Sequence, residues 1–326
     1  MRRREFLGVL SSAAAAWSLD VRAQQGSMPV IGFLGTRGPD DDPYLLSAWR
    51  RGLKDAGHIE GQNLRIEYRW AENRYDRLPA LATDLVQSRV HAIYANGPAA
   101  QAAKPATTTI PIIFTAGFDL VELGLVTSLS RPGGNITGIS ILDVELGPKR
   151  LELLHEMVPT TKNIGVLVNA TDRSRAEIIT KEMRAAAETL GLQAHVASAS
   201  TDQELETAFS SLAKLHAGAL AIGGDPFFNS RGEQLGELSI RHAMPAIYQF
   251  RTFAEGGGLA SYGTDLAEAY FQSGRYVGRV LKGEKPADLP IQLATKIELI
   301  INLKTAKALG LDLPPSILVR ADEVIE

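Results

Sequence analysis

Short apolar runs alternate with amphipathic segments along the chain from position 29 onward. Residues 30–34 form an apolar run typical of a buried strand, and within 44–56 the apolar Leu45, Trp49 and Leu53 recur on one helical face. The same pattern predicts strands at 64–70 and 90–95 and helices at 77–87 and 99–103. Strands that alternate with helices favour a parallel, doubly wound α/β sheet.

The second half of the chain repeats this alternation. Apolar runs predict strands at 164–168, 193–197, 219–222 and 246–248, and amphipathic stretches predict helices at 173–190, 204–215 and 230–242. Short matches support a duplication, because IGFL at 31–34 corresponds to IGVL at 164–167, an offset of 133, and PIIF at 111–114 corresponds to PAIY at 245–248, an offset of 134. We therefore expect two similar βα lobes.

The stretch 114–140 connects these lobes. It predicts the end of a strand, a polar loop at 115–119, a small helix at about 121–129 and a new strand at 136–141. The run Arg131-Pro132-Gly133-Gly134 would end the helix, because proline lacks the next donor and glycine tolerates a positive φ. The loop is expected to form half of a ligand site, and the hinge between the lobes is expected at 137–140.

The remaining tail must be assigned to these lobes. It predicts a helix at 266–281 with Asp265 in its N-cap, a strand at 297–301, a helix at 303–309 and a final strand at 317–319. The tail is too short for a third lobe. We expect one lobe from 29–137 plus about 264–310, and a second lobe with the hinge return from 138–263 plus about 311–326.

The first 23 residues predict a cleaved export signal. Arg2-Arg3-Arg4 is a positive segment, residues 6–19 are apolar and alanine-rich, and 21–23 suit a signal peptidase. Arg3-Arg4 followed by Phe6-Leu7 favours twin-arginine export, with an ordinary secretory signal as the alternative. The chain has no cysteine, so neither disulfides nor a lipid anchor on cysteine are expected. We expect a periplasmic, monomeric protein.

Charge and motifs exclude several functions. The net charge is −3 and no charge run suggests a nucleic-acid arm, which is untypical of a nucleic-acid binder. Dinucleotide and Walker glycine motifs, the G-x-S-x-G elbow and zinc-type histidine spacing do not occur in the sequence. We therefore expect no enzyme activity, no cofactor and no metal.

Candidate ligand contacts lie in the loops that follow the predicted strands, because ligands of parallel sheets bind beyond the carboxyl ends of the strands. Their aromatic faces, carboxylates and single guanidinium suit a small polar or zwitterionic ligand held between the lobes. The expected ligand-binding residues are Arg37, Asp42, Asn96, Phe118, Asp119, Asn169, Asp225, Phe228, Tyr248 and Tyr262.

Each of these residues has a structural alternative. Asp42 could cap the helix that follows, and Asn96 and Asp225 could do the same for theirs. Phe228 could belong to the core, and Arg37 could face solvent. Tyr262 is the aromatic residue of the second lobe that we favour most as a ligand contact.

Three segments resemble a known family: residues 113–140, 225–263 and 278–326, the last with KGEKPADLP and NLKTAKALG. They are similar to substrate-binding proteins of ABC transporters of the tryptophan and aromatic amino-acid type. The resemblance implies a type I periplasmic-binding-protein fold, with two Rossmann-like lobes of parallel sheet, a multi-strand hinge and a small ligand in the cleft. It also implies an amino acid or related carboxylate as ligand and an ABC permease in the inner membrane as partner. A periplasmic sensor that signals to a membrane receptor is the alternative.

Overall fold

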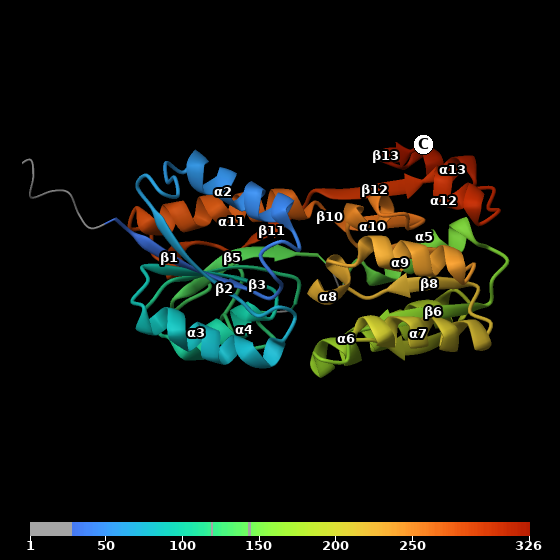
Figure 1. The fold of residues 1–326 in the computed structure, drawn as a ribbon, viewed down its shortest axis with the longest axis horizontal. Helices are drawn as coiled ribbons and strands as arrows, with labels where there is room; N and C mark the ends of the chain where they lie inside the picture. Colours follow the sequence, from blue (N-terminus) through green and yellow to red (C-terminus); the bar gives the residue numbers. More distant parts are fainter. Residues whose placement is uncertain (1–27, 119, 143–144) are drawn as a thin grey trace, which may run out of the picture.

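The computed structural model describes residues 28–118, 120–142 and 145–326. Figure 1 shows two lobes side by side along the long axis of the molecule. Asp119, one of the expected site residues, lies outside the described residues, as does the expected export signal.

The first lobe is built on a sheet in which all strand pairs are parallel. Within the described chain it has six strands, in the spatial order β2 (Arg65–Trp70), β1 (Val30–Gly35), β3 (Ala92–Asn96), β4 (Ile112–Ala116), β5 (Ile136–Ile141) and β11 (Gln292–Ala294). One face is covered by α2 (Pro43–Asp55) and α11 (Leu266–Leu281), and the other by α3 (Leu78–Gln87) and α4 (Ala99–Ala106) (Figure 1).

The second lobe repeats this arrangement. Its described strands number seven, in the spatial order β7 (Gln193–Ser198), β6 (Asn163–Val168), β8 (Ala219–Ile222), β9 (Ala246–Tyr248), β10 (Ala260–Thr264), β12 (Ile297–Asn302) and β13 (Glu323–Ile325). Only the β10–β12 pair among them is antiparallel. The helices are α5 (Gly147–Met157), α6 (Arg173–Thr189), α7 (Asp202–Lys214), α8 (Pro226–Asn229), α9 (Gly232–Arg241), α10 (Arg251–Glu255), α12 (Leu303–Ala308) and α13 (Pro315–Val319).

The two sheets share one topology over their first five strands. The order β2-β1-β3-β4-β5 in the first lobe is the order β7-β6-β8-β9-β10 in the second. Gly32 and Gly165 occupy equivalent strand positions, and a Cβ on either would lie 2.9 Å from a leucine side chain, Leu85 or Leu212. The expected α/β fold with two mostly parallel sheets is confirmed.

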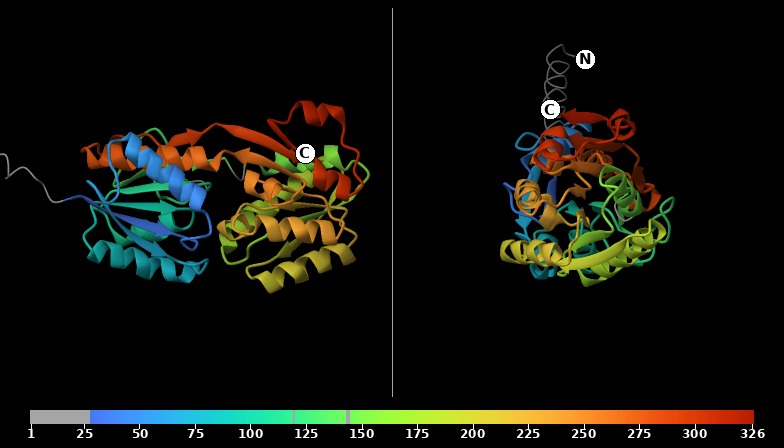
Figure 2. Two further views of the ribbon diagram at one scale, coloured as in Figure 1. Left: turned by 45° about the horizontal axis from the view of Figure 1, so that its top comes forward. Right: turned by 90° about the vertical axis from the view of Figure 1, so that its right-hand side faces the viewer.

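The described chain passes between the lobes at three places: from β5 to α5, from β10 to α11, and from β11 to β12. The left view of Figure 2 shows the red segment with β12 running from the first lobe to the second. These three connections form the hinge. Of the described helices, none is long and apolar enough to cross a membrane.

The pairing of β12 corrects one expected boundary. Residues 297–310 were assigned to the first lobe, but β12 pairs with β10 in the sheet of the second lobe. Its apolar residues Leu299, Ile300 and Ile301 are buried there. The first crossing also lies later than expected, because β5 stays paired with β4 up to Ser140 and with β11 up to Ile141.

Two local predictions were wrong. Residues 121–129 form turns and bends instead of a helix; Gly124 has a φ of +66°, and Val121, Leu123 and Leu129 are exposed although Val126 is buried. The segment 317–319 belongs to helix α13, which starts with Pro315 in its first turn, and the final strand follows at β13. Helices α5 and α10 and strand β11 were not predicted.

Two glycines allow α2 and α11 to pack closely in the first lobe. A Cβ on Gly52 would lie 2.0 Å from the carbonyl oxygen of Phe271, and one on Gly274 would lie 2.2 Å from that of Trp49. Both distances are shorter than non-bonded atoms allow. This contact fixes α11, which the chain enters directly after its second crossing between the lobes.

Candidate functional site

A small cavity lies where the carboxyl ends of the strands of the two lobes face each other. It encloses about 50 Å³ and is called the inner cavity here. Residues of both lobes line it: Arg37, Asn96, Thr115 and Tyr270 from the first, and Arg175, Asp225, Asn229 and Gln249 from the second. This is the position that the topology of parallel sheets predicts for a ligand.

Asp225 is the most buried carboxylate of the inner cavity, with 3% of its surface exposed. Its Oδ1 atom caps α8 by accepting from the backbone N–H of Phe227 at 2.8 Å. The same oxygen accepts from Asn169 Nδ2 at 2.8 Å and from the hydroxyl of Tyr75 at 3.0 Å. Its Oδ2 atom is buried and has no hydrogen-bond partner in the described part of the chain.

The surroundings of Asp225 contain groups that favour its ionised carboxylate, but burial disfavours that form. Burial raises the pKa of this carboxyl above its ordinary value, although hydrogen bonds from Asn169 and Phe227 and the charge of Arg175 lower it. An additional cationic donor at Oδ2 would satisfy the remaining oxygen and favour the ionised form.

Arg37 supplies positive charge from the first lobe. Its side chain is buried and forms an ion pair with Asp42. Burial lowers the pKa of the guanidinium, but the charge and hydrogen bond of Asp42 together with Tyr270 and Tyr44 outweigh it, so the net shift is upward. At Asp42 burial outweighs the attraction of Arg37, and the pKa of that carboxyl is raised. The Nε atom of Arg37 has no hydrogen-bond partner among the described residues, so it remains available as a donor.

Asn96 positions other groups of the cavity wall. Its Oδ1 accepts from the backbone N–H of Thr36 at 3.0 Å, and its Nδ2 donates to the hydroxyl of Tyr270 at 2.8 Å. The amide therefore ties the end of β3 to the end of β1 and to α11. This arrangement fixes the backbone just before Arg37.

Tyr75 and Arg175 each form a hydrogen bond between the lobes. Tyr75 of the first lobe donates to Asp225 of the second. Arg175 of α6 donates from Nε to the carbonyl of Gly224 in its own lobe at 2.7 Å and from a terminal nitrogen to the carbonyl of Gly117 in the first lobe at 2.8 Å. The lobes are thus held in a closed arrangement.

A larger depression lies on the other side of Arg175 and is called the outer groove here. It encloses about 570 Å³ between the two lobes. Its wall combines apolar and acidic side chains: Gln101, Phe118, Glu122 and Leu123 from the first lobe, and Glu145, Pro148, Asp172, Ser174, Arg175, Ile178 and Glu182 from the second.

The predicted site residues fall into three groups. Arg37, Asn96 and Asp225 line the inner cavity, and Asn169 and Asp42 contact them without lining it. Phe118 lines the outer groove. Phe228, Tyr248 and Tyr262 lie elsewhere: Phe228 is fully buried, the Tyr248 hydroxyl contacts Asn229 and the backbone of Asp225, and Tyr262 packs against an apolar cluster of the second lobe.

Several residues of the site were not predicted, and three of them, Tyr75, Arg175 and Tyr270, make hydrogen bonds described above. Tyr75 follows β2, whose carboxyl end lies at the same sheet edge as that of β1, so the rule that found Arg37 could also have found it. Arg175 lies in the first turn of α6, and Tyr270 in the second turn of α11. No signal in the sequence placed these two helical residues at the cleft.

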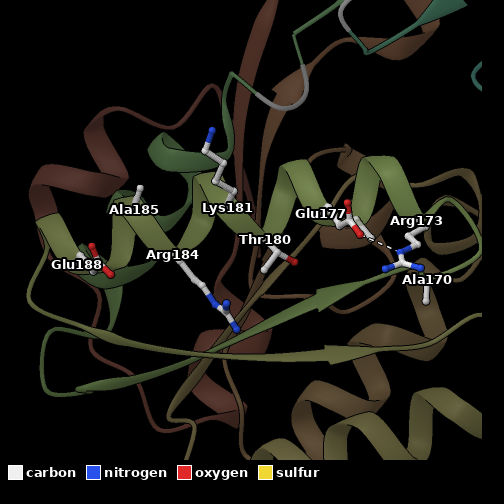
Figure 3. A pocket seen from close by; sticks show the side chains of 9 residues that line it. Ala170, Arg173, Glu177, Thr180, Lys181, Arg184, Ala185 and Glu188 are labelled. Carbon is white, nitrogen blue, oxygen red and sulfur yellow. Dashed lines mark hydrogen bonds and ion pairs between the residues drawn. The ribbon is translucent and has the colours of Figure 1, made fainter. Parts of the chain in front are cut away.

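The depression on the outer face of α6 is not a plausible ligand site. Figure 3 shows that its labelled residues come from this helix and the segment just before it, with Arg173 paired to Glu177. Arg173 and Glu177 are 89% and 67% exposed, so this is a solvated helix face. Among the described residues, no group of three or more histidine or acidic side chains could hold a metal ion.

Comparison with known proteins identifies the family. The family model "ABC transporter substrate binding protein" matches residues 46–325, and the chain belongs to this family. The chain is 33% identical over 264 residues to the tyrosine-binding protein of Clostridioides difficile, covering 80% of this chain and 75% of that protein.

Solved structures show the same fold. A conserved domain protein from Vibrio cholerae superposes with a TM-score of 0.84 at 27% identity, covering 91% of this chain and 100% of that one. A protein from Streptococcus pneumoniae in complex with L-Trp superposes with a TM-score of 0.82 at 26% identity, covering 92% of this chain and 100% of that one. A ligand-free, open substrate-binding protein from Clostridium difficile superposes with a TM-score of 0.64 at 25% identity, covering 91% of this chain and 99% of that one. The better match to the L-Trp complex agrees with the closed arrangement of the lobes.

The chain is therefore a substrate-binding protein of the ABC transporter class with the type I periplasmic-binding fold. Its family and relatives are binding proteins, which confirms the expected non-enzymatic role.

Proposed function

We propose that this protein binds an α-amino acid with a large side chain between its two lobes and delivers it to an ABC permease. The observation that carries the proposal is the buried Asp225, whose Oδ2 lacks a partner among the described residues and which lines one cavity with Arg37 of the opposite lobe. A carboxylate and a guanidinium on opposing walls match the ammonium and carboxylate of a zwitterion.

The relatives support this class of ligand. One curated relative is named for binding tyrosine, and a similar structure contains L-Trp. Both ligands are amino acids with a large aromatic side chain that carries a polar hydrogen.

The mechanism follows from the hinge. The ligand would enter while the lobes are apart, and closure would then bring Arg37 and Asp225 onto its two charged groups. Since such a ligand contacts both lobes only when they are closed, its binding energy favours the closed state. A permease that recognises the closed surface would then receive loaded protein. No covalent step is required.

The expected export signal at the N-terminus supports a location for the protein. Arg3-Arg4 and the apolar segment after them support export to the periplasm, with the twin-arginine route as the proposed path. We propose that the exported protein works as a soluble monomer beside an inner-membrane permease.

A ligand screen on the purified protein without its leader tests this proposal. The melting temperature would be measured with L-tyrosine, L-tryptophan, purines and small carboxylates, and each stabilising compound would be titrated by calorimetry. We expect one or both amino acids to stabilise the protein in proportion to their concentration. Stabilisation by purines or simple carboxylates alone would rule out the amino-acid site.

A further inference from the structure

The two spaces between the lobes differ greatly in size. The inner cavity encloses about 50 Å³, which leaves room only for a few water-sized molecules. The outer groove encloses about 570 Å³, within the range of about 300–1,000 Å³ that is usual for small-molecule sites. The charged groups that suit a zwitterion lie in the smaller space, so a large amino acid cannot fit there as a whole.

Arg175 is the side chain that separates these spaces, because it lines both of them. It is half-buried and reaches from α6 to Gly117 across the cleft. Two of its hydrogen bonds go to backbone carbonyls, those of Gly224 in its own lobe and Gly117 in the first lobe. A rotation of this flexible side chain would join the inner cavity to the outer groove.

We propose that Arg175 is a movable partition and that the outer groove is the subsite for the side chain of the ligand. This inference rests on the proposed function, which places the ammonium and carboxylate of the ligand in the inner cavity. The side chain would then extend past Arg175 along α6, between the two lobes.

The wall of the outer groove determines which side chains fit. Arg175, Ile178 and Glu182 follow one another at i, i+3 and i+7 on α6 and therefore share a face of the helix. Arg175 and Glu182 lie about 10 Å apart along the helix axis, because the helix rises about 1.5 Å per residue. Phe118 and Leu123 of the first lobe complete the same groove.

This order of side chains favours one class of ligand. Ile178 follows Arg175 along α6, Phe118 and Leu123 add apolar surface to the same groove, and the half-buried Glu182 lies beyond Ile178 as an acceptor. A side chain that is apolar in its middle and carries an O–H or N–H donor at its end meets both requirements. The groove should therefore prefer L-tyrosine to L-phenylalanine, which lacks the donor.

The first test fills the groove. Ile178 is 37% exposed, so Ile178→Trp should fold normally while it occupies the space beside Arg175. Ile240→Trp is the matched control, because Ile240 is 41% exposed and lies on α9, away from the cleft. In calorimetric titrations with L-tyrosine and L-tryptophan, we expect Ile178→Trp to weaken binding at least tenfold and Ile240→Trp to leave it within twofold.

The second test removes the acceptor. Glu182→Leu should reduce the preference for L-tyrosine over L-phenylalanine from about tenfold or more to less than threefold. Glu188→Leu, on the same helix but outside the groove, should leave the preference unchanged.

The two proposals fail differently. If neither L-tyrosine nor L-tryptophan binds the unaltered protein, the proposed amino-acid function is wrong and this inference falls with it. If they bind, but Ile178→Trp and Glu182→Leu titrate like their controls, the function stands and the outer groove is not the side-chain subsite.

Discussion

The hydroxyl of Tyr75 in the first lobe donates a hydrogen bond of 3.0 Å to Asp225 Oδ1 in the second lobe. The bond joins two residues that are 150 positions apart in the chain, one in each lobe, so separation of the lobes would break it. The carboxylate that we assign to ligand binding therefore also takes part in closure. A ligand ammonium would use Oδ2 while Tyr75 keeps Oδ1.

Removal of this hydroxyl should shift the protein toward open forms. Tyr75→Phe deletes one cross-lobe hydrogen bond to a charged acceptor, which costs the closed state about 1–3 kcal/mol. We expect a larger radius of gyration in small-angle scattering of the protein without added amino acid. Tyr276→Phe is the matched control, because its hydroxyl donates to Pro290 within the first lobe. An unchanged radius for Tyr75→Phe would show that the bond does not hold the lobes together.

Asp225→Asn should weaken amino-acid binding without unfolding the protein. Asparagine keeps the size of the side chain and can still cap α8. It lacks the charge that an ammonium group requires. We expect a loss of about 10–100-fold in calorimetric affinity and a melting temperature within a few degrees of the unaltered protein. Full affinity in this variant would place the ammonium elsewhere.

The affinity should fall in mildly acidic solution. Burial raises the pKa of Asp225 above the ordinary 3.8, so this carboxyl takes up a proton at a higher pH than an exposed aspartate does. Arg37 keeps its charge and Tyr75 its proton, because the pKa of each is raised. The ligand ammonium also stays charged, so affinity should decrease as the pH falls through the raised pKa of Asp225.

The raised pKa of Asp225 changes the stability of the fold with pH in the opposite direction to its effect on ligand affinity. The folded state holds this proton more tightly than the unfolded state, so the carboxyl adds stability below its unfolded pKa, and that contribution is lost as the pH rises through the folded value. Titrations at a series of pH values would check the binding effect. Asp225→Asn should show a flatter profile, and an identical profile in both proteins would assign the effect to another group.

Gly52→Ala should destabilise the first lobe. The added Cβ would lie 2.0 Å from the carbonyl oxygen of Phe271, so α2 and α11 would have to move apart. Overpacking of this kind costs about 1–3 kcal/mol, which should lower the melting temperature by several degrees. Ser47→Ala, at an exposed position of the same helix, should have little effect. Equal melting temperatures for the two variants would contradict this account of the α2–α11 contact.

The alternation of strands and helices and the duplication could be predicted because both follow from local pattern. Each lobe repeats apolar strands of a few residues, and the IGFL and IGVL runs became the equivalent strands β1 and β6. The sheet that a strand joins is not encoded locally. From its pattern alone, the apolar run at 297–301 could complete either sheet. In the structure it pairs antiparallel with β10 of the second sheet, although β11 before it belongs to the first.

The site was predictable as far as it lies in loops after strands. Arg37, Asn96 and Asp225 were found because the carboxyl ends of parallel strands converge. Arg175 and Tyr270 come from helices, and their approach to the cleft depends on how α6 and α11 pack. Tyr262 was favoured for its place at a strand end, but it is not among the residues that line the inner cavity.

The most direct test of the central claim is a crystal structure of the protein with the amino acid that raises its melting temperature most. We expect the ammonium within hydrogen-bonding distance of Asp225 Oδ2, the carboxylate facing Arg37, and the lobes closed around the ligand. An amino acid bound outside the space between the lobes, or bound there without contact to Asp225, would contradict the account.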